Sequence, residues 1–185
     1  FDSQARTFTC FKPDGNKAGL SYYNIHGLLA TGDELCVGTF EHGLDVLDIN
    51  TGNVIRRYSA NTGEGSFKSN FIYSIHQTRS GEILLGTSQG LYRYDRENDA
   101  FVVLQDFPIE LHYTAILEDH TGTIWAGTYR DGVYFSDEET GVKGYFKHEP
   151  GNVQRLNSNT VNDIFEDSAH NLWFTTDGGL SRFYR

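Results

Sequence analysis

Two adjacent pairs of carboxylates are the residues of this chain that most resemble catalytic machinery. Glu118 precedes Asp119, and the same pair recurs as Glu166 and Asp167. Paired carboxylates can serve as acid and base in hydrolysis. Neighbouring residues of a strand, however, point to opposite faces, and these pairs recur in step with a longer repeat. We therefore predict that they hold turns through hydrogen bonds from side chain to backbone.

Two tryptophans, Trp125 and Trp173, occupy equivalent positions a few residues after these pairs. An exposed indole could stack on a sugar ring, but a position in the middle of a strand favours packing between structural units. Four threonines also recur and are expected to be framework residues: Thr39, Thr87, Thr128 and Thr176.

Metal and cofactor motifs are missing from the sequence. The seven histidines and two cysteines form no HxH, HExxH or CxxC pattern, and no phosphate-binding loop, GxSxG or dinucleotide fingerprint occurs. We predict no catalytic residue, no metal and no cofactor, and hence no enzyme in this stretch. Cys36 lies in an apolar strand and is expected to be a buried hydrophobe. A bridge to Cys10 would need an oxidising compartment, and no feature of the sequence supports it.

The elements that must position these residues form a repeat. Residues 122–137, GTIWAGTYRDGVYFSD, predict a turn, a short apolar strand ending in Gly-Thr, a polar loop and a second strand. Residues 34–48, 82–95 and 171–184 repeat this pattern. A period of roughly 40–50 residues made only of strands is typical of propeller blades.

Each repeat is expected to contain up to four strands, named a to d. The a segments space apolar residues by three, which also fits a helical turn, but their β-branched and aromatic residues favour a strand. A glycine or asparagine in each following turn supplies positive φ, with Asn171 filling this role in the last repeat. The a segments are residues 24–30, 71–77, 112–118 and 160–166; the b segments are 35–39, 83–87, 124–128 and 172–176; the c segments begin at Gly43, Gly90, Gly132 and Gly179; the d segments are 54–58, 101–104 and 142–147.

The sequence thus predicts an all-β chain, a β-propeller of about four blades made of four-stranded antiparallel sheets. Its units are residues 1–22 (an outer strand and lead-in), 23–59, 60–105, 106–148 and 149–185, the last without its outer strand. Residues 7–11 alternate like a d strand, and Phe1-Asp2 resembles the end of a c strand.

The sequence is compatible with two arrangements of the blades. Residues 3–11 could complete the last blade and close a four-blade ring, or the chain could be part of a larger ring. An open array exposes apolar faces and unpaired edges, so in that case we expect a dimer or a larger self-association.

Candidate ligand-binding residues are those that do not repeat. Loops between b and c strands and between d and a strands meet at one rim of a propeller, and binding residues often sit on such loops. These loops mix aromatic, basic and acidic side chains, a set suited to stacking on sugars and hydrogen-bonding them. The candidates are Phe40, Glu41, His42, Tyr129, Arg130, Asp131, Asp177, Tyr23 and His112.

The overall charge excludes some partners. The net charge is −10 without a basic cluster, which argues against nucleic acid and against contact with an anionic membrane. No apolar run approaches the roughly 18 residues of a membrane helix.

The third repeat resembles the two-component regulator propeller repeat. Glu118-Asp119, Gly122, Ile124-Trp125, Gly127-Thr128 and Gly132-Val133 follow the family pattern E-D-x-x-G-x-L-W-x-G-T-x-x-G-L. The fourth repeat keeps Glu-Asp, Trp173 and Thr176 but has Asn171 and Thr175 at glycine positions; the first two keep only Gly-Thr and lack Glu-Asp and Trp.

The resemblance implies a role that spacing alone does not show. Such propellers are extracytoplasmic sensors of hybrid two-component systems, common in Bacteroidetes, which lie in the periplasm ahead of a membrane helix and a histidine kinase. Many respond to carbohydrate breakdown products, and they work as dimers. An oligosaccharide-type ligand and a periplasmic location are therefore expected. A protein-interaction scaffold and, less favoured, a propeller lyase or glycosidase are the alternatives.

Overall fold

Four small antiparallel sheets follow one another along an open arc in the computed structural model, which describes residues 7–60, 62–63 and 66–184. The first sheet contains β1 (Ile25–Thr31), β2 (Glu34–Thr39), β3 (Leu44–Asp48) and β4 (Val54–Tyr58). The second contains β5 (Ile72–Gln77), β6 (Ile83–Thr87), β7 (Gly90–Asp95) and β8 (Ala100–Val103). The third contains β9 (Tyr113–Glu118), β10 (Ile124–Thr128), β11 (Val133–Ser136) and β12 (Lys143–Phe146). The fourth contains β13 (Val161–Glu166), β14 (Leu172–Thr176) and β15 (Gly179–Phe183).

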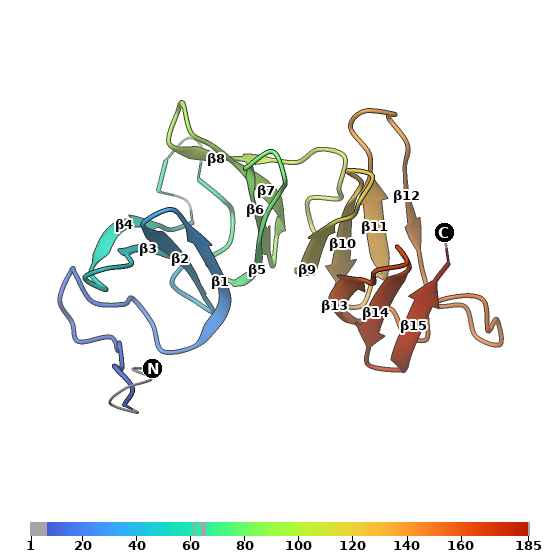
Figure 1. Cartoon of the computed structure of the whole chain (residues 1–185), viewed down its shortest axis with the longest axis horizontal. Helices are drawn as coiled ribbons and strands as arrows, with labels where there is room; N and C mark the ends of the chain where they lie inside the picture. The colour runs from blue at the N-terminus through green and yellow to red at the C-terminus, as the bar shows by residue number, and fades with distance from the viewer. Residues whose placement is uncertain (1–6, 61, 64–65, 185) are drawn as a thin grey trace.

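These sheets are the blades of a β-propeller, in sequence order and each joined strand to strand by short turns (Figure 1). The inner strands pack against one another, β1 against β5, β5 against β9 and β9 against β13. The prediction of strands rather than helical turns for the a segments is confirmed, and so are the predicted b, c and d strands of the four sheets to within a residue or two. No helix of the described part of the chain has the length and apolar character needed to cross a membrane.

The apolar residues of the strands meet between neighbouring blades. One cluster joins blades 1 and 2 around Cys36, Phe67 and Ile72, and another joins blades 3 and 4 around Trp125 and Val161. Both cysteines are free, and Cys36 is buried in the first cluster as expected, where burial raises the pKa of its thiol.

The threonine that ends each second strand has a structural role in all four blades. Each threonine hydroxyl donates to the carbonyl at the start of the third strand, at 2.8 Å for Thr39, Thr128 and Thr176 and at 3.0 Å for Thr87. The preceding Gly127 leaves no room for a side chain, because a Cβ there would lie 2.7 Å from the Val161 side chain of the next blade. The repeat therefore encodes both the hairpin and the close approach of blades.

The prediction of a d strand at residues 7–11 is wrong. Within it only Thr7 forms an isolated bridge, and the following residues are exposed and irregular. The Phe11 ring lies against Gly52 in the first blade, while the fourth blade is at the far end of the arc (Figure 1). A strand cannot pair with a sheet that it does not reach, so the described part of this segment does not complete blade 4. Phe1-Asp2 lies outside the described residues.

Candidate functional site

Two opposite edges of the arc differ in character. The loop rim, as we call it, consists of the residues just before each inner strand and just after each second strand. The turn rim consists of the tight turns that join these two strands. A six-residue inner strand separates the two rims by about 20 Å, because a strand rises roughly 3.3 Å per residue.

A repeated backbone contact assembles the loop rim. The N–H of the residue after each second strand donates to the carbonyl of the residue before the inner strand: Phe40 to Asn24, Ser88 to Phe71, Tyr129 to His112 and Asp177 to Thr160. In blades 1 to 3 this contact brings aromatic side chains to the rim. In blade 4 it brings only Asp177, which accepts from the Asn162 amide at 3.0 Å.

Each inner strand also carries a β-bulge near its start. The registers skip one residue in every blade, at His26, Tyr73, Thr114 and Asn162. A bulge leaves one residue out of the ladder and re-aims its side chain. The first two of these residues therefore join the rim aromatics.

Together these residues form a continuous aromatic surface, which we call the aromatic ladder. The Tyr73 ring is stacked on His112 at 6.1 Å between centroids and meets His26 edge-on at 5.8 Å. Neighbouring rings along the ladder have centroids 4.9 to 6.2 Å apart. Its members come from three blades: His26, Phe40, Phe71, Tyr73, His112 and Tyr129.

Polar groups flank both ends of the ladder. At one end the Arg130 guanidinium lies over the Tyr129 ring at 4.7 Å, and Arg130 adopts φ of 77°. At the other end Tyr22 stacks on His42 at 4.6 Å. The Glu41 carboxylate accepts from the Tyr22 hydroxyl and raises the pKa of that group. Stacking faces thus lie beside charged hydrogen-bonding groups.

The structure brings most of the predicted binding residues to this surface. Phe40, His112 and Tyr129 belong to the ladder, and Tyr23, 73% exposed, packs edge-on against Tyr22. Two predicted residues lie apart from it. Asp131 is held within its own blade by the Tyr134 hydroxyl at 2.5 Å and the Lys147 ammonium at 2.8 Å, and Asp177 stands on blade 4.

Sequence reasoning missed His26, Phe71, Tyr73 and Tyr22. Phe71 and Tyr73 fall within the predicted strand 71–77, and a regular strand would direct both to the same face of its sheet. Only the β-bulge directs the Tyr73 side chain to the rim, and no residue type in these strands indicates that a bulge is present. An aromatic residue next to the first apolar anchor of an inner strand is the one available signal.

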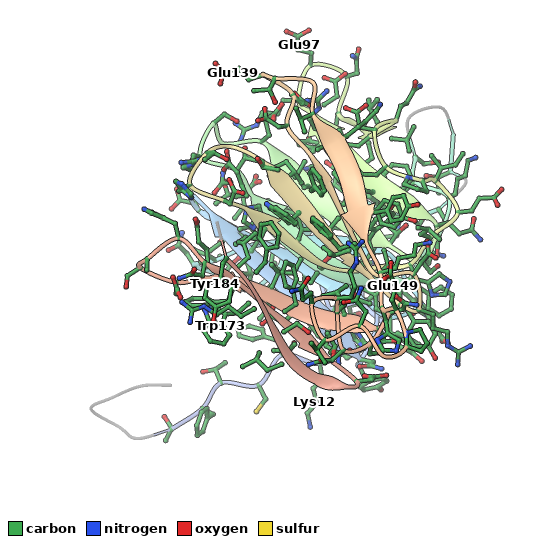
Figure 2. The ribbon with its side chains drawn as sticks, turned by 90° about the vertical axis from the view of Figure 1, so that its right-hand side faces the viewer. Lys12, Glu97, Glu139, Glu149, Trp173 and Tyr184 are labelled. Carbon is green, nitrogen blue, oxygen red and sulfur yellow. The ribbon has the colours of Figure 1, made fainter. Side chains whose placement is uncertain are left out.

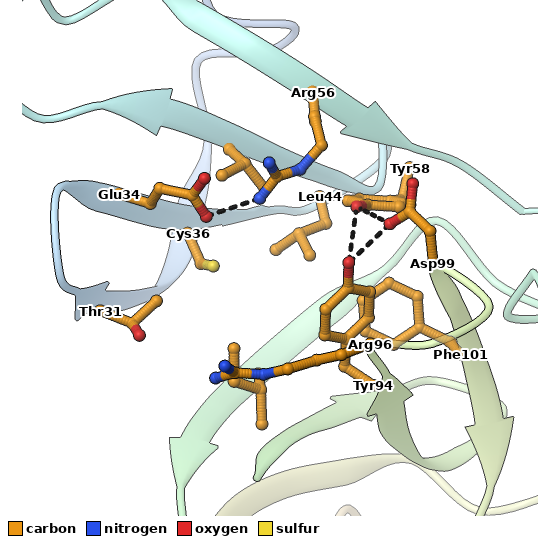
Figure 3. Close-up of a pocket in the computed structure, with 12 residues that line it drawn as sticks. Thr31, Glu34, Cys36, Leu44, Arg56, Tyr58, Tyr94, Arg96, Asp99 and Phe101 are labelled. Atoms are coloured by element: carbon orange, nitrogen blue, oxygen red, sulfur yellow. Dashed lines mark hydrogen bonds and ion pairs between the residues drawn. The ribbon is translucent and has the colours of Figure 1, made fainter. Parts of the chain in front are cut away.

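A second candidate is a cavity of about 430 Å³ between blades 1 and 2 on the side of the turn rim (Figure 3). The Tyr58 and Tyr94 hydroxyls both donate to Asp99, at 2.5 and 2.6 Å, and Arg56 pairs with Glu34 at 2.5 Å. These hydrogen bonds from Tyr58 and Tyr94 lower the pKa of Asp99. A polar ligand would have to break these hydrogen bonds and this ion pair in order to bind in the cavity.

The Glu-Asp pairs hold turns, as the sequence predicted. The Asp119 carboxylate is 1% exposed and accepts from the backbone of Thr121 and Thr123 and from the Trp125 indole, at 2.9, 3.2 and 2.6 Å. Asp167 bonds Ala169, Asn171 and Trp173 in the same way.

The glutamates reach instead to the preceding blade. Glu118 accepts from the Arg79 N–H at 2.6 Å, and Glu166 accepts from the His120 N–H at 2.9 Å. Both carboxylates of each pair are thus engaged by the framework. They do not face one another across a substrate site.

The two tryptophans have different surroundings. Trp125 is buried against Phe174 and Phe183 of the next blade, so packing between blades is confirmed for it. Trp173, on the last blade, is half-buried instead. The Arg182 guanidinium lies over its ring at 4.9 Å and over the Tyr184 ring at 4.4 Å. Trp173 and Tyr184 lie close together on this blade (Figure 2).

A pH dependence follows from the Asp167 turn. Hydrogen bonds from the Trp173 indole and the Asn171 backbone lower the pKa of Asp167 from 3.8 to about 2. A lowered pKa stabilises the fold above the unfolded-state value, and this contribution is lost as the pH falls through the folded-state value. We expect the Tm of the wild-type chain to fall more steeply between pH 4 and pH 2 than that of Asp167→Asn. If thermal melts gave the same slope of Tm against pH for both chains over this range, Asp167 would not be the source of this pH dependence.

Comparisons with known proteins agree with the blade architecture. Residues 109–130 and 155–178 match the two component regulator propeller family. These segments fall in the third and fourth blades. A search of curated proteins found no match.

Solved structures share the fold at low identity. The extracellular domain of the hybrid two component system BT3049 from B. thetaiotaomicron has a TM-score of 0.58 and 18% identity over 97% of this chain and 29% of that one. The corresponding domain of BT4673 from B. thetaiotaomicron has a TM-score of 0.53 and 24% identity over 86% of this chain and 27% of that one. An ancestral GH74 enzyme has a TM-score of 0.66 and 14% identity over 95% of this chain and 24% of that one. The chain therefore spans less than a third of the length of these extracellular domains and of this enzyme, and the fold by itself does not select between a sensor and an enzyme.

Proposed function

We propose that this chain is part of the extracytoplasmic sensor of a hybrid two-component system, because segments of its third and fourth blades match the two component regulator propeller family. The proposed location is the periplasm, and the proposed signal is a carbohydrate breakdown product. The extracellular domains of B. thetaiotaomicron that share this fold support the first part of the proposal. The aromatic ladder supports the second.

The ladder is the single observation that carries the choice of ligand. Sugar rings present apolar C–H faces that stack on aromatic rings, while their hydroxyls need donors and acceptors nearby. Tyr73, His112 and Tyr129 provide a run of partly exposed aromatic rings along the rim. Glu41 and Arg130 provide hydrogen-bonding groups at its two ends. An extended oligosaccharide, rather than a single sugar, matches a surface that crosses three blades.

Tyr129 is the residue whose removal tests this proposal with least disturbance. Its side chain is 44% exposed and belongs to the loop after β10, so Tyr129→Ala removes a stacking face without opening the core. We expect isothermal titration to show that one member of a panel of neutral cello-, xylo- and malto-oligosaccharides binds the chain. Its affinity should fall about fivefold in Tyr129→Ala, since a stacked ring contributes roughly 1 kcal/mol.

Tyr184→Ala is the matched control, because Tyr184 is 70% exposed and lies on blade 4. It should bind as the wild type does. No binding by any oligosaccharide, or equal losses in both variants, would contradict the proposal. Capture of a protein partner that Tyr129→Ala alone abolishes, without oligosaccharide binding, would favour an interaction scaffold instead.

A further inference from the structure

Three side chains that play no part in the proposed oligosaccharide site converge on the turn rim between blades 3 and 4. They are His120 from the turn after β9, Glu166 from the end of β13 and His170 from the turn after β13. One ligand atom from each lies within 4.8 Å of the other two. We propose that these residues bind a divalent transition-metal ion of the zinc class and so link the two blades.

The geometry points three donor atoms at one place. The Nδ1 atoms of His120 and His170 both face Oε1 of Glu166, the latter at 3.2 Å. The imidazole rings are stacked with centroids 3.8 Å apart and an interplanar angle of 24°. Ligands of a tetrahedral zinc ion, bound at roughly 2.0–2.1 Å, lie about 3.4 Å from one another. The 3.2 Å between Nδ1 of His170 and Oε1 of Glu166 is close to this separation.

The donor set also has the chemistry that such an ion requires. Two imidazole nitrogens and one carboxylate oxygen suit Zn²⁺ and its neighbours Cu²⁺ and Ni²⁺ better than Mg²⁺ or Ca²⁺, which prefer oxygen ligands. Each imidazole would bind through an unprotonated Nδ1, with its ring proton on Nε2. Three protein ligands leave a fourth position for water. His120, Glu166 and His170 side chains are 34%, 16% and 55% exposed, so an ion can reach them from solvent.

The cluster departs from the repeat, which distinguishes it from the framework. At the junction of blades 2 and 3 the same glutamate position, Glu118, pairs with Arg79, which stands in the place of His120. His170 occupies the turn position that Gly122 and Gly81 fill in the two preceding blades.

The backbone conformation of His170 is a further sign that its imidazole has a function. Its φ is 64°, in the left-handed region that glycine adopts freely and that is strained for other residues. Such strained residues concentrate at functional sites. Asn171, predicted from sequence as the glycine-like position, is instead the counterpart of Thr123, and its amide bonds Asp167 at 3.1 Å.

The test is a titration of the whole chain with ZnCl₂ in a buffer that does not chelate metals. We expect one Zn²⁺ per chain and a rise in Tm that EDTA reverses, because an ion that binds only the folded chain stabilises it. His170→Asn tolerates positive φ, and Glu166→Gln keeps an acceptor for the His120 N–H. Each should weaken Zn²⁺ binding by at least about tenfold, since each removes one of three ligands.

Glu139→Gln is the control for loss of negative charge, because Glu139 is exposed on another turn of blade 3. It should bind Zn²⁺ as the wild type does. Tryptophan fluorescence of Trp125 and Trp173 checks that both ligand variants are folded. Unchanged Zn²⁺ affinity in a folded His170→Asn or Glu166→Gln would overturn the proposal, and so would a wild-type chain that takes up no Zn²⁺.

Discussion

Asp119→Ala is expected to lower the free energy of unfolding by about 4 kcal/mol, because it takes the acceptor away from two buried donors. These donors are the Trp125 indole N–H and the Thr123 backbone N–H. A buried donor left without a partner costs roughly 1–3 kcal/mol. Trp125 also lies in the cluster that joins blades 3 and 4, so its displacement would loosen that junction.

Urea unfolding followed by tryptophan fluorescence measures this effect. Asp137→Ala is the matched control, because Asp137 accepts two backbone N–H groups in the turn after β11, where water can replace it. It should lose much less stability. Similar losses in the two variants would show that the buried donors are not what makes Asp119 important.

Gly132→Ala is expected to lower the free energy of unfolding by about 3 kcal/mol, from strain and overlap together. Gly132 begins the third strand of blade 3 with φ of 83°, which an alanine resists. Its Cβ would also lie 2.2 Å from the Phe146 carbonyl oxygen, so backbone would have to move. The Thr128 hydroxyl bonds the Gly132 carbonyl, and the hairpin that leads to Tyr129 would shift with it.

Gly141→Ala separates these two causes. Gly141 has a comparable φ of 70° but no atom within 4 Å of its would-be Cβ. It should lose only the strain, about 1–2 kcal/mol. If chemical denaturation gave equal losses for both, the close approach at Gly132 would not matter to stability.

The fold could be predicted from the sequence because its cause is local and repeated. Gly127, Thr128 and Gly132 define a hairpin whose hydrogen bonds lie within five residues, and four copies place every second strand correctly. The Asp119 turn was predictable for the same reason. The prediction for residues 7–11 was wrong because alternation of apolar and polar residues does not specify which sheet the segment can reach.

The proposed binding surface was only partly predictable, since it depends on contacts between blades. Phe40, His112 and Tyr129 were found as aromatic residues that do not repeat. The place of Tyr73 on this surface depends on a β-bulge, which the sequence does not indicate. The roles of Glu118 and Glu166 depend on contacts with the turn of the preceding blade. The order of residues along the chain does not specify how close that turn lies.

The most direct test of the proposed binding surface is an NMR titration of the chain labelled at histidine and tyrosine side chains, using the oligosaccharide that binds most tightly. The proposal predicts shifts for His26, His112, Tyr73 and Tyr129, which lie on the aromatic ladder. His120, His170 and Tyr184, which lie outside the ladder, should not respond. Shifts confined to the turn rim, or to Tyr58 and Tyr94 in the cavity between blades 1 and 2, would contradict it.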